Sequence, residues 1–353
     1  MTGLSVALAL LQRGTSVTVL ECGRVGGESS WAGGGILSPL LPWEYAEPVT
    51  ALALRSMKQY EAWVNWIEQL ADRDTELWRC GMLAVDVSVP EQARAWCTGQ
   101  GFESQAVEHI APPLRNTLDP ENMIWLPGIA QVRNPRLITA LRTAIVGMGG
   151  MVREHCAVGG VRVVGGRVIG IQTSFDELPV DRVVLATGAW AGTGLAGLNP
   201  VPNIRPIRGQ MLLFKLEPGA LDMIVYRHGH YLIPRRDGHI LVGSTLEDVG
   251  FDKSTDIPTR QRLHAAAAEL LPILSSVQPI QHWSGLRPGS PDNIPIIDRH
   301  PDFDNVFVNT GHYRYGVTMA PASAELLVDL MEGNTPALNP APYRWQAAAA
   351  RRW

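Results

Sequence analysis

The sequence has few of the features that mark metal-binding, disulfide-bonded or redox-thiol proteins. Its 353 residues include only four cysteines, Cys22, Cys80, Cys97 and Cys156. These are far apart in the chain, and no two of them form a C-x-x-C pair. A zinc site or a dithiol site needs closely spaced sulfur ligands, so the spacing indicates reduced structural thiols and no bound metal.

The chain also lacks a run of basic residues and a long apolar run. It has 30 Lys and Arg against 34 Asp and Glu, and the signs are interspersed. This gives no basic patch for nucleic acid. Charges or prolines break each apolar stretch before the roughly 18 residues that a membrane-spanning helix needs, and no basic segment of a signal peptide follows Met1. We expect a cytoplasmic protein without nucleic-acid or membrane partners.

A further absence concerns the first structural unit. Residues 4–12 form an apolar helical run, and residues 16–20 form a β-branched strand that ends at Glu21. In a dinucleotide-binding βαβ unit, a strand leads into G-x-G-x-x-G, and an acid about 20 residues on binds the ribose. Gly3 and Glu21 fit the last two parts, whereas the first strand and glycines are absent from this sequence. Taken alone, one glycine and one glutamate are weak evidence for a dinucleotide-binding unit, because any α/β turn supplies such a pair.

The hydrophobic patterns that are present indicate α/β segments interleaved with antiparallel strand segments. Helices are expected at 48–71, 91–97, 135–146, 259–271 and 317–331. Strands are expected at 77–87, 151–153, 161–173 (a hairpin about Gly165-Gly166), 181–185 (buried), 210–216, 231–243 (bent at Asp237-Gly238) and 306–309. The tail from Gln346 is expected to be frayed. Antiparallel pieces between α/β pieces favour a nucleotide-binding domain interrupted by a second, sheet-rich domain.

Four glycine-rich stretches carry the functional signal. Gly26–Pro39 reads GGESSWAGGGILSP, whose triple glycine lets a backbone lie flat against a planar ligand, although a flexible surface loop is the plain alternative. Val183–Gly192, VVLATGAWAG, is a strand that breaks where open α/β sheets place ligands. Ser284–Asp298, SGLRPGSPDNIPIID, is expected to hold Arg287 in a turn fixed by Gly and Pro. Asn309–Pro321, NTGHYRYGVTMAP, is a strand, a glycine loop and a helix start, which favours an anionic group.

In this order and spacing, the stretches resemble the FAD-dependent glycine oxidase and D-amino acid oxidase family, with the bacterial glycine oxidase branch most similar. The resemblance runs from Gly3 to about Met331, and SSWAGGGILSP, HYLIPRRDGHILVGST, GLRPGSPDNIP and GHYRYGV are its most specific parts. It implies an α/β fold in which a Rossmann-like FAD-binding domain is interleaved with a substrate domain on an antiparallel sheet. The implied FAD-binding segments are 1–72, 130–200 and 285–340, the substrate-binding segments are 73–129 and 201–284, and 341–353 is a C-terminal tail.

The resemblance also implies the residues that contact FAD. Glu21 and Cys22 would contact the adenosine ribose, Val158 the adenine, and Ser29 and Ser30 the pyrophosphate. The flavin would lie against the triple glycine and the loop from His312 to Thr318. The full implied set is Thr2, Gly3, Glu21, Cys22, Ser29, Ser30, Gly34, Gly35, Ile36, Val158, Gly188, His312, Tyr313, Arg314, Tyr315, Gly316, Val317 and Thr318.

Three residues are implied to hold the substrate. Arg287 would clamp the carboxylate, because its planar fork pairs with both oxygens, which lysine cannot imitate. Tyr231 would add a hydroxyl, and Arg314 would border the amine through its backbone carbonyl. Without the family context, a surface ion pair for Arg287 and half-buried packing for Tyr231 are the preferred interpretations.

The chemistry implied is oxidation of an amine next to a carboxylate. Glycine, sarcosine or D-alanine would give an oxo acid, ammonium and hydrogen peroxide with O₂ as the acceptor, and the glycine imine would serve thiamine biosynthesis. The family also implies a possible homotetramer. Two alternatives stay open: a D-amino acid or sarcosine dehydrogenase with another acceptor, or a truncated, non-catalytic chain that cannot hold FAD. We also expect Met1 to be an internal position of a longer gene product, at a valine or isoleucine position of the family's loop.

Overall fold

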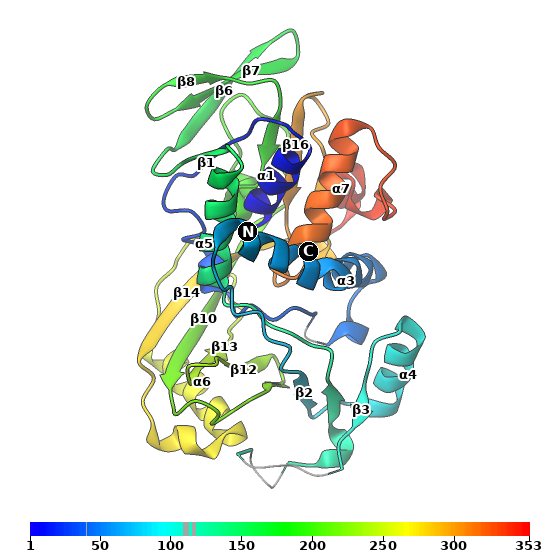
Figure 1. Cartoon of the computed structure of the whole chain (residues 1–353), viewed down its shortest axis with the longest axis vertical. Coiled ribbons are helices and arrows are strands. Elements are labelled where there is room, and N and C mark those ends of the chain that lie inside the picture. The colour runs from blue at the N-terminus through cyan, green and yellow to red at the C-terminus, as the bar shows by residue number, and fades with distance from the viewer. Residues whose placement is uncertain (40, 109–112, 115–117) are drawn as a thin grey trace.

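The computed structural model describes residues 1–39, 41–108, 113–114 and 118–353, and helices and strands are interleaved throughout (Figure 1). The helices are α1 (Thr2–Gln12), α2 (Ser29–Ala32), α3 (Glu47–Ala71), α4 (Pro90–Gln100), α5 (Asn134–Gly147), α6 (Ile257–Leu270), α7 (Ala320–Glu332) and α8 (Trp345–Ala350). The strands are β1 (Thr18–Leu20), β2 (Met82–Val85), β3 (Gln105–Ala106), β4 (Ile124–Leu126), β5 (Met151–Arg153), β6 (Val158–Val164), β7 (Arg167–Thr173), β8 (Glu177–Pro179), β9 (Val183–Leu185), β10 (Arg205–Lys215), β11 (Ile224–Arg227), β12 (His230–Pro234), β13 (His239–Gly243), β14 (Gln281–Gly289), β15 (Ile296–Arg299) and β16 (Val306–Thr310).

A large sheet occupies the lower half of Figure 1. Its strand order is β14-β10-β13-β12-β11-β2-β4-β3, and its neighbours are antiparallel except for the parallel pair of β2 and β11. Helix α6 packs on β10, β12 and β13, where Leu263 and Leu270 are buried with Phe214 and Leu232. An antiparallel sheet needs only one face in the core, which leaves its other face free to line a site.

The upper half of the molecule is an α/β layer. Strand β1 runs parallel to β5, β9 runs parallel to β16, and β15 is antiparallel on the other edge of β16. Helix α1 packs on α5 and α7, and α3 packs on the same two helices. A separate antiparallel sheet, β6-β7-β8, stands at the top of Figure 1. The expected α/β fold with an antiparallel second sheet is therefore confirmed.

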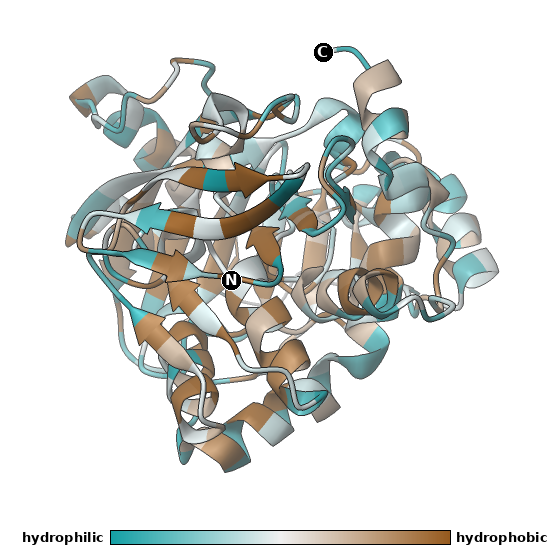
Figure 2. Ribbon diagram, turned by 90° about the horizontal axis from the view of Figure 1, so that it is seen from above, coloured by the Kyte–Doolittle hydropathy of each residue, from teal (hydrophilic) through white to brown (hydrophobic). Residues whose placement is uncertain are grey.

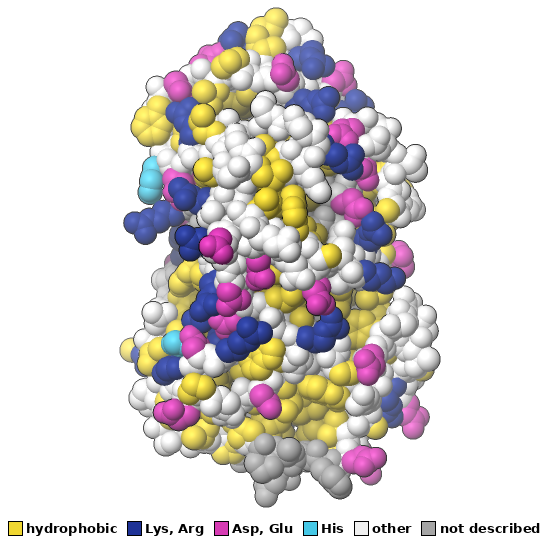
Figure 3. Space-filling view, in the orientation of Figure 1, with side chains coloured by type: hydrophobic (Ala, Val, Ile, Leu, Met, Phe, Trp, Pro, Cys, Tyr) yellow, Lys and Arg dark blue, Asp and Glu magenta, His cyan; other side chains and the backbone are white. Residues whose placement is uncertain are grey.

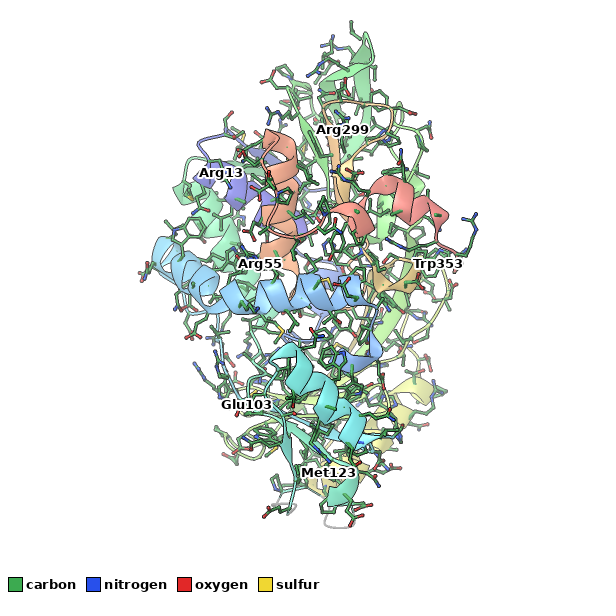
Figure 4. The ribbon with its side chains drawn as sticks, turned by 90° about the vertical axis from the view of Figure 1, so that its right-hand side faces the viewer. Arg13, Arg55, Glu103, Met123, Arg299 and Trp353 are labelled. Carbon is green, nitrogen blue, oxygen red and sulfur yellow. The ribbon has the colours of Figure 1, made fainter. Side chains whose placement is uncertain are left out.

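Helix α3 joins the two halves, and its sequence explains its length. Pro48 occupies the first turn, where a missing N–H costs nothing, and Asp72 ends the helix in a left-handed conformation. Apolar residues recur at helical spacing on its buried face, which carries Val49, Leu52, Ala53, Tyr60, Val64 and Ile67. Figure 4 shows α3 crossing between α7 and α4, and Arg55 on α3 forms an ion pair with Glu325 on α7 at 2.6 Å.

The side chains sort by polarity as this layering requires. Figure 2 shows hydrophobic residues concentrated on strands and on inward helix faces, with polar residues at the periphery. On the face shown in Figure 3, acidic and basic side chains are mixed and no patch of one sign dominates. Among the described residues, no helix is both long and apolar enough to cross a membrane.

Several sequence-based expectations need correction. Arg287 was expected in a turn, but it lies inside β14, paired in register with Ile207, because the Gly and Pro residues around it are accommodated within a strand. The tail that was expected to be frayed instead forms α8. Trp345 in this helix is buried, and its backbone N–H donates to the Asp298 carboxylate at 2.9 Å. The strand expected to be buried at 181–185 is only half-buried as β9.

Candidate functional site

A cavity lies where the α/β layer meets the large sheet. It encloses about 1120 Å³ of space free of atoms, part of it open to solvent. Fifteen of the residues implied to bind FAD or substrate line it: Thr2, Ser29, Ser30, Gly34, Gly35, Ile36, Gly188, Tyr231, Arg287, His312, Tyr313, Arg314, Tyr315, Gly316 and Val317. The fold thus brings together residues from both ends of the chain and from the second sheet.

The triple glycine forms one wall of the cavity. Neighbouring atoms leave no space for side chains at Gly34 and Gly35. Gly35 has φ +78°, and a Cβ there would collide with the carbonyl oxygen of Val132. A Cβ on Gly34 would collide with Ile233. The buried guanidinium of Arg235 donates to the carbonyls of Gly34 at 2.8 Å and Val132 at 3.0 Å, so the glycine backbone is held in place.

The loop between β16 and α7 forms another wall. It opens at Gly311, with φ +80°, and the Tyr315 N–H donates back to the His312 carbonyl at 2.9 Å. The Thr318 hydroxyl donates to the Ile36 carbonyl at 2.9 Å, which fastens this loop to the glycine wall. Thr318 itself does not line the cavity, and α7 begins at Ala320, three residues later than expected.

Arg287 enters the cavity from β14. Its guanidinium donates to the Ser244 hydroxyl at 2.7 Å and to the carbonyls of Thr245 at 3.1 Å and Arg208 at 3.3 Å. These acceptors are neutral, so no carboxylate of the chain neutralises it at these contacts. Burial is the main cause that lowers the pKa of Arg287, and the nearby Arg314 adds to the shift.

Tyr231 and Arg314 complete the charged and hydroxyl-bearing part of the cavity. Tyr231 lies on β12 and is 8% exposed, and its hydroxyl contacts the sulfur of Met211 at 3.9 Å. Burial opposes the charge of Arg314, but the hydroxyls of Tyr315, Tyr45 and Tyr231 raise its pKa. Arginine side chains do not lose their proton in proteins, so both groups are cations at neutral pH.

His312 is neutral in this environment. Burial lowers the pKa of His312 to about 3, and the N-terminal ammonium adds to the shift. Its Nε2 atom is buried without a hydrogen-bond partner among the described residues, as are both side-chain polar atoms of Asn309 on β16. Buried polar atoms are normally paired, so the Nε2 atom of His312, a residue that lines the cavity, fits a bound polar group.

Besides Thr318, four residues implied to contact FAD lie outside the cavity lining. Gly3 packs against Ala186, the residue that follows β9: a Cβ on Gly3 would lie 3.1 Å from the Ala186 Cβ, in keeping with the close helix-strand packing expected of this glycine. Glu21 and Cys22 follow β1, where Glu21 accepts a bond from the Gly23 N–H at 2.9 Å. Val158 begins β6, and the roles of these residues stay predictions.

The structure adds lining residues that the motifs did not reveal. Met211, Pro288 and Thr310 line the cavity, as do Gly209 and Gly285, which pair in register across β10 and β14. Glycines inside strands signal a close approach of other groups, so this signal was available in the sequence. Of the cysteines, Cys80, Cys97 and Cys156 are buried, whereas Cys22 is exposed and is not a core thiol.

The comparisons with known proteins fit this site. A family model described as FAD dependent oxidoreductase matches residues 1–330. The chain belongs to this family. A glycine oxidase of Pseudomonas aeruginosa is 43% identical over 345 residues, with 97% of this chain and 95% of the relative covered. A bifunctional protein ThiO/ThiG of Trichormus variabilis is 32% identical, with 93% of this chain and 51% of the relative covered.

Solved structures agree with the sequence relatives. The crystal structure of glycine oxidase from Geobacillus kaustophilus matches with a TM-score of 0.90 and 26% identity, over 98% of this chain and 95% of that chain. The family membership confirms the expected resemblance, the fold, the FAD cofactor and the class of FAD-dependent amino acid oxidases. The glycine wall and the partnerless polar atoms fit FAD as the group that this cavity holds.

Proposed function

We propose that this enzyme oxidatively deaminates glycine and other small amino acids such as sarcosine and D-alanine. One observation carries the proposal: a guanidinium without a carboxylate partner, that of Arg287, meets the Tyr231 side chain in a cavity walled by the triple glycine. A planar guanidinium and a phenol together match one carboxylate. The glycine oxidase relatives support glycine as the substrate.

The FAD-binding residues are proposed as the resemblance implies. Ser29 and Ser30 would hold the pyrophosphate, and the triple glycine together with the loop from His312 to Thr318 would hold the flavin. Bound there, FAD would supply the two-electron acceptor for oxidation at the substrate's Cα. Glu21, Cys22 and Val158 would bind the adenosine end outside the cavity lining.

The chain's own residues orient the substrate. Arg287 and Tyr231 fix the carboxylate, and the Arg314 backbone carbonyl accepts a bond from the amine, so one Cα–H direction is selected. No Asp or Glu lines the described cavity, and His312, with its low pKa, is a poor base. The amine therefore has to bind in its neutral form, and proton removal precedes hydride transfer.

The products follow from mass balance. Glycine, water and O₂ give glyoxylate, ammonia and hydrogen peroxide, with the imine as the species that water hydrolyses. We propose that the imine or its product serves thiamine biosynthesis, which the likeness to a ThiO/ThiG protein supports. The cytoplasmic location and the homotetramer stay predictions.

The substrate range should favour small amines. Gly34 and Gly35 make a flat wall, Tyr231 lies beside Gly34, and Met211 lines the same cavity. Glycine, sarcosine and D-alanine are therefore expected to outrank bulky D-amino acids in kcat/KM. Faster turnover of D-phenylalanine than of glycine would contradict this range.

The test begins with the FAD-loaded protein. Anaerobic addition of glycine, sarcosine or D-alanine should bleach the flavin absorption, and under air one peroxide should form for each glyoxylate. Bleaching without peroxide, with turnover only on an artificial acceptor, would identify a dehydrogenase. Bound FAD that no small amino acid bleaches would reject the proposed function.

A further inference from the structure

The charge balance of the cavity is one-sided. Its described lining contains two guanidinium groups, Arg287 and Arg314, and no Asp or Glu. The two arginines are close enough for the charge of Arg314 to lower the pKa of Arg287. Two like charges in a half-enclosed cavity repel, so the cavity is prepared for an anion.

Arg314 is half-buried, and it differs from other buried or half-buried arginines among the described residues. Arg235 has neutral acceptors, namely Gln131 and the carbonyls of Val132 and Gly34. Arg208 is 7% exposed and pairs with Glu247 and Asp252, and the side chain of Arg133 pairs with Glu76 and Asp237. Among the described residues, no hydrogen bond or ion pair to the Arg314 guanidinium occurs, although Arg314 lines the cavity. A half-buried guanidinium in a cavity is normally paired with an acid or with neutral acceptors, so a partner for Arg314 is expected from outside the chain.

Tyrosines surround Arg314 in place of acids. The rings of Tyr45 and Tyr315 meet edge to face at 5.0 Å, and their hydroxyls are hydrogen-bonded to each other. Tyr226 on β11 and Tyr231 on β12 also act on the charge of Arg314. Glu44 precedes Tyr45 in the chain and acts on Tyr226, and burial raises the pKa of Glu44, but no ion pair between Glu44 and Arg314 occurs among the described residues.

We infer that the Arg314 guanidinium, together with these tyrosine hydroxyls, binds a second carboxylate of the substrate. The inference rests on the proposed function, in which Arg287 already holds the α-carboxylate. It predicts that amino acids with two carboxylates, such as iminodiacetate or D-aspartate, are better substrates than their neutral amides. The second carboxylate selects the substrate and takes no part in the bond changes at Cα.

Two substrate pairs test this on the FAD-loaded wild type. Iminodiacetate is compared with its monoamide, and D-aspartate with D-asparagine, because each pair differs in charge and hardly in size. At least one dicarboxylate should exceed its amide by about tenfold or more in kcat/KM, as a charge-assisted pair requires. If glycine is oxidised but neither pair shows a preference, this inference fails while the proposed function stands. If no amino acid is oxidised, the proposed function fails.

The variant Arg314→Gln assigns the preference to this residue. The ratio of dicarboxylate to amide should fall toward one, whereas Arg79→Gln, which removes an exposed arginine of the Glu61 ion pair, should keep the wild-type ratio. An unchanged ratio in Arg314→Gln would overturn the inference. Neither diglycolate nor its monoamide has an amine that can be oxidised. Calorimetric titration with each compound therefore measures the preference for the second carboxylate as a ratio of dissociation constants. That readout stays valid where Arg314→Gln turns over slowly.

Discussion

The guanidinium of Arg287 lies over the α-carbon of Gly209, in the space that a Cβ on Gly209 would fill. Gly209 is on β10 and Arg287 on the neighbouring β14, and the two strands pair over nine residue positions. The bare backbone of Gly209 thus lets the arginine lie flat against the sheet. The hydroxyl of Ser244 and the carbonyl of Thr245 then fix its planar group.

Gly209→Ala should weaken substrate binding and leave FAD in place. The added methyl group displaces the Arg287 guanidinium, so KM for glycine should rise by about tenfold or more, which corresponds to about 1.4 kcal/mol. Steady-state kinetics and the flavin-to-protein absorbance ratio measure both effects. Gly99→Ala is the matched control, because no atom lies within 4 Å of its added Cβ. Equal KM values in the two variants would show that Arg287 does not need this space.

Arg287→Ala should lower kcat/KM with FAD still bound. Loss of one partner of a buried charge-assisted pair costs about 2–4 kcal/mol, or roughly 30- to 1000-fold in kcat/KM. Arg287→Lys keeps the charge and loses the planar fork, so we expect it to restore only part of the loss. Wild-type kinetics in Arg287→Ala would remove this residue from the substrate site.

Gly35→Ala should reduce FAD content and stability together. A left-handed backbone conformation costs a non-glycine residue about 1–2 kcal/mol, and the collision with Val132 adds to this. Gly149→Ala carries the same backbone cost at φ +84° but has open space around the Cβ. Thermal melting and flavin content should separate the two variants. FAD content as high in Gly35→Ala as in Gly149→Ala would argue against a flavin at this wall.

His312 should make the fold sensitive to acid. The pKa of His312 in the folded chain, about 3, lies below its ordinary value of 6.5, so the unfolded chain gains a proton first as the pH falls. Above pH 6.5 the group has no effect, and stability is lost between pH 6.5 and 3, by about 2 kcal/mol at pH 5. In urea unfolding at pH 7 and 5, His312→Asn should lose about 2 kcal/mol less than wild type. The exposed control His155→Asn should behave like wild type, and an equal loss in all three proteins would contradict the assignment.

The sequence by itself determined the local elements and the family. Apolar spacing places α3 within one residue of the range expected, and Gly165-Gly166 marks the turn between β6 and β7. These features depend on neighbours a few residues apart, so periodicity and turn chemistry are sufficient. The ordered motifs likewise identified the FAD family, which the comparisons confirm.

The tertiary structure decided which of the motif residues meet. Strand pairing in register, and not a local turn, brings Arg287 over Gly209, and no local pattern sets the register between segments far apart in the chain. Packing of separate segments likewise gathers Tyr45 near Arg314 and leaves Glu21 outside the cavity lining. The sequence named the arginines, but their burial and their distances from every carboxylate are properties of the packed chain alone.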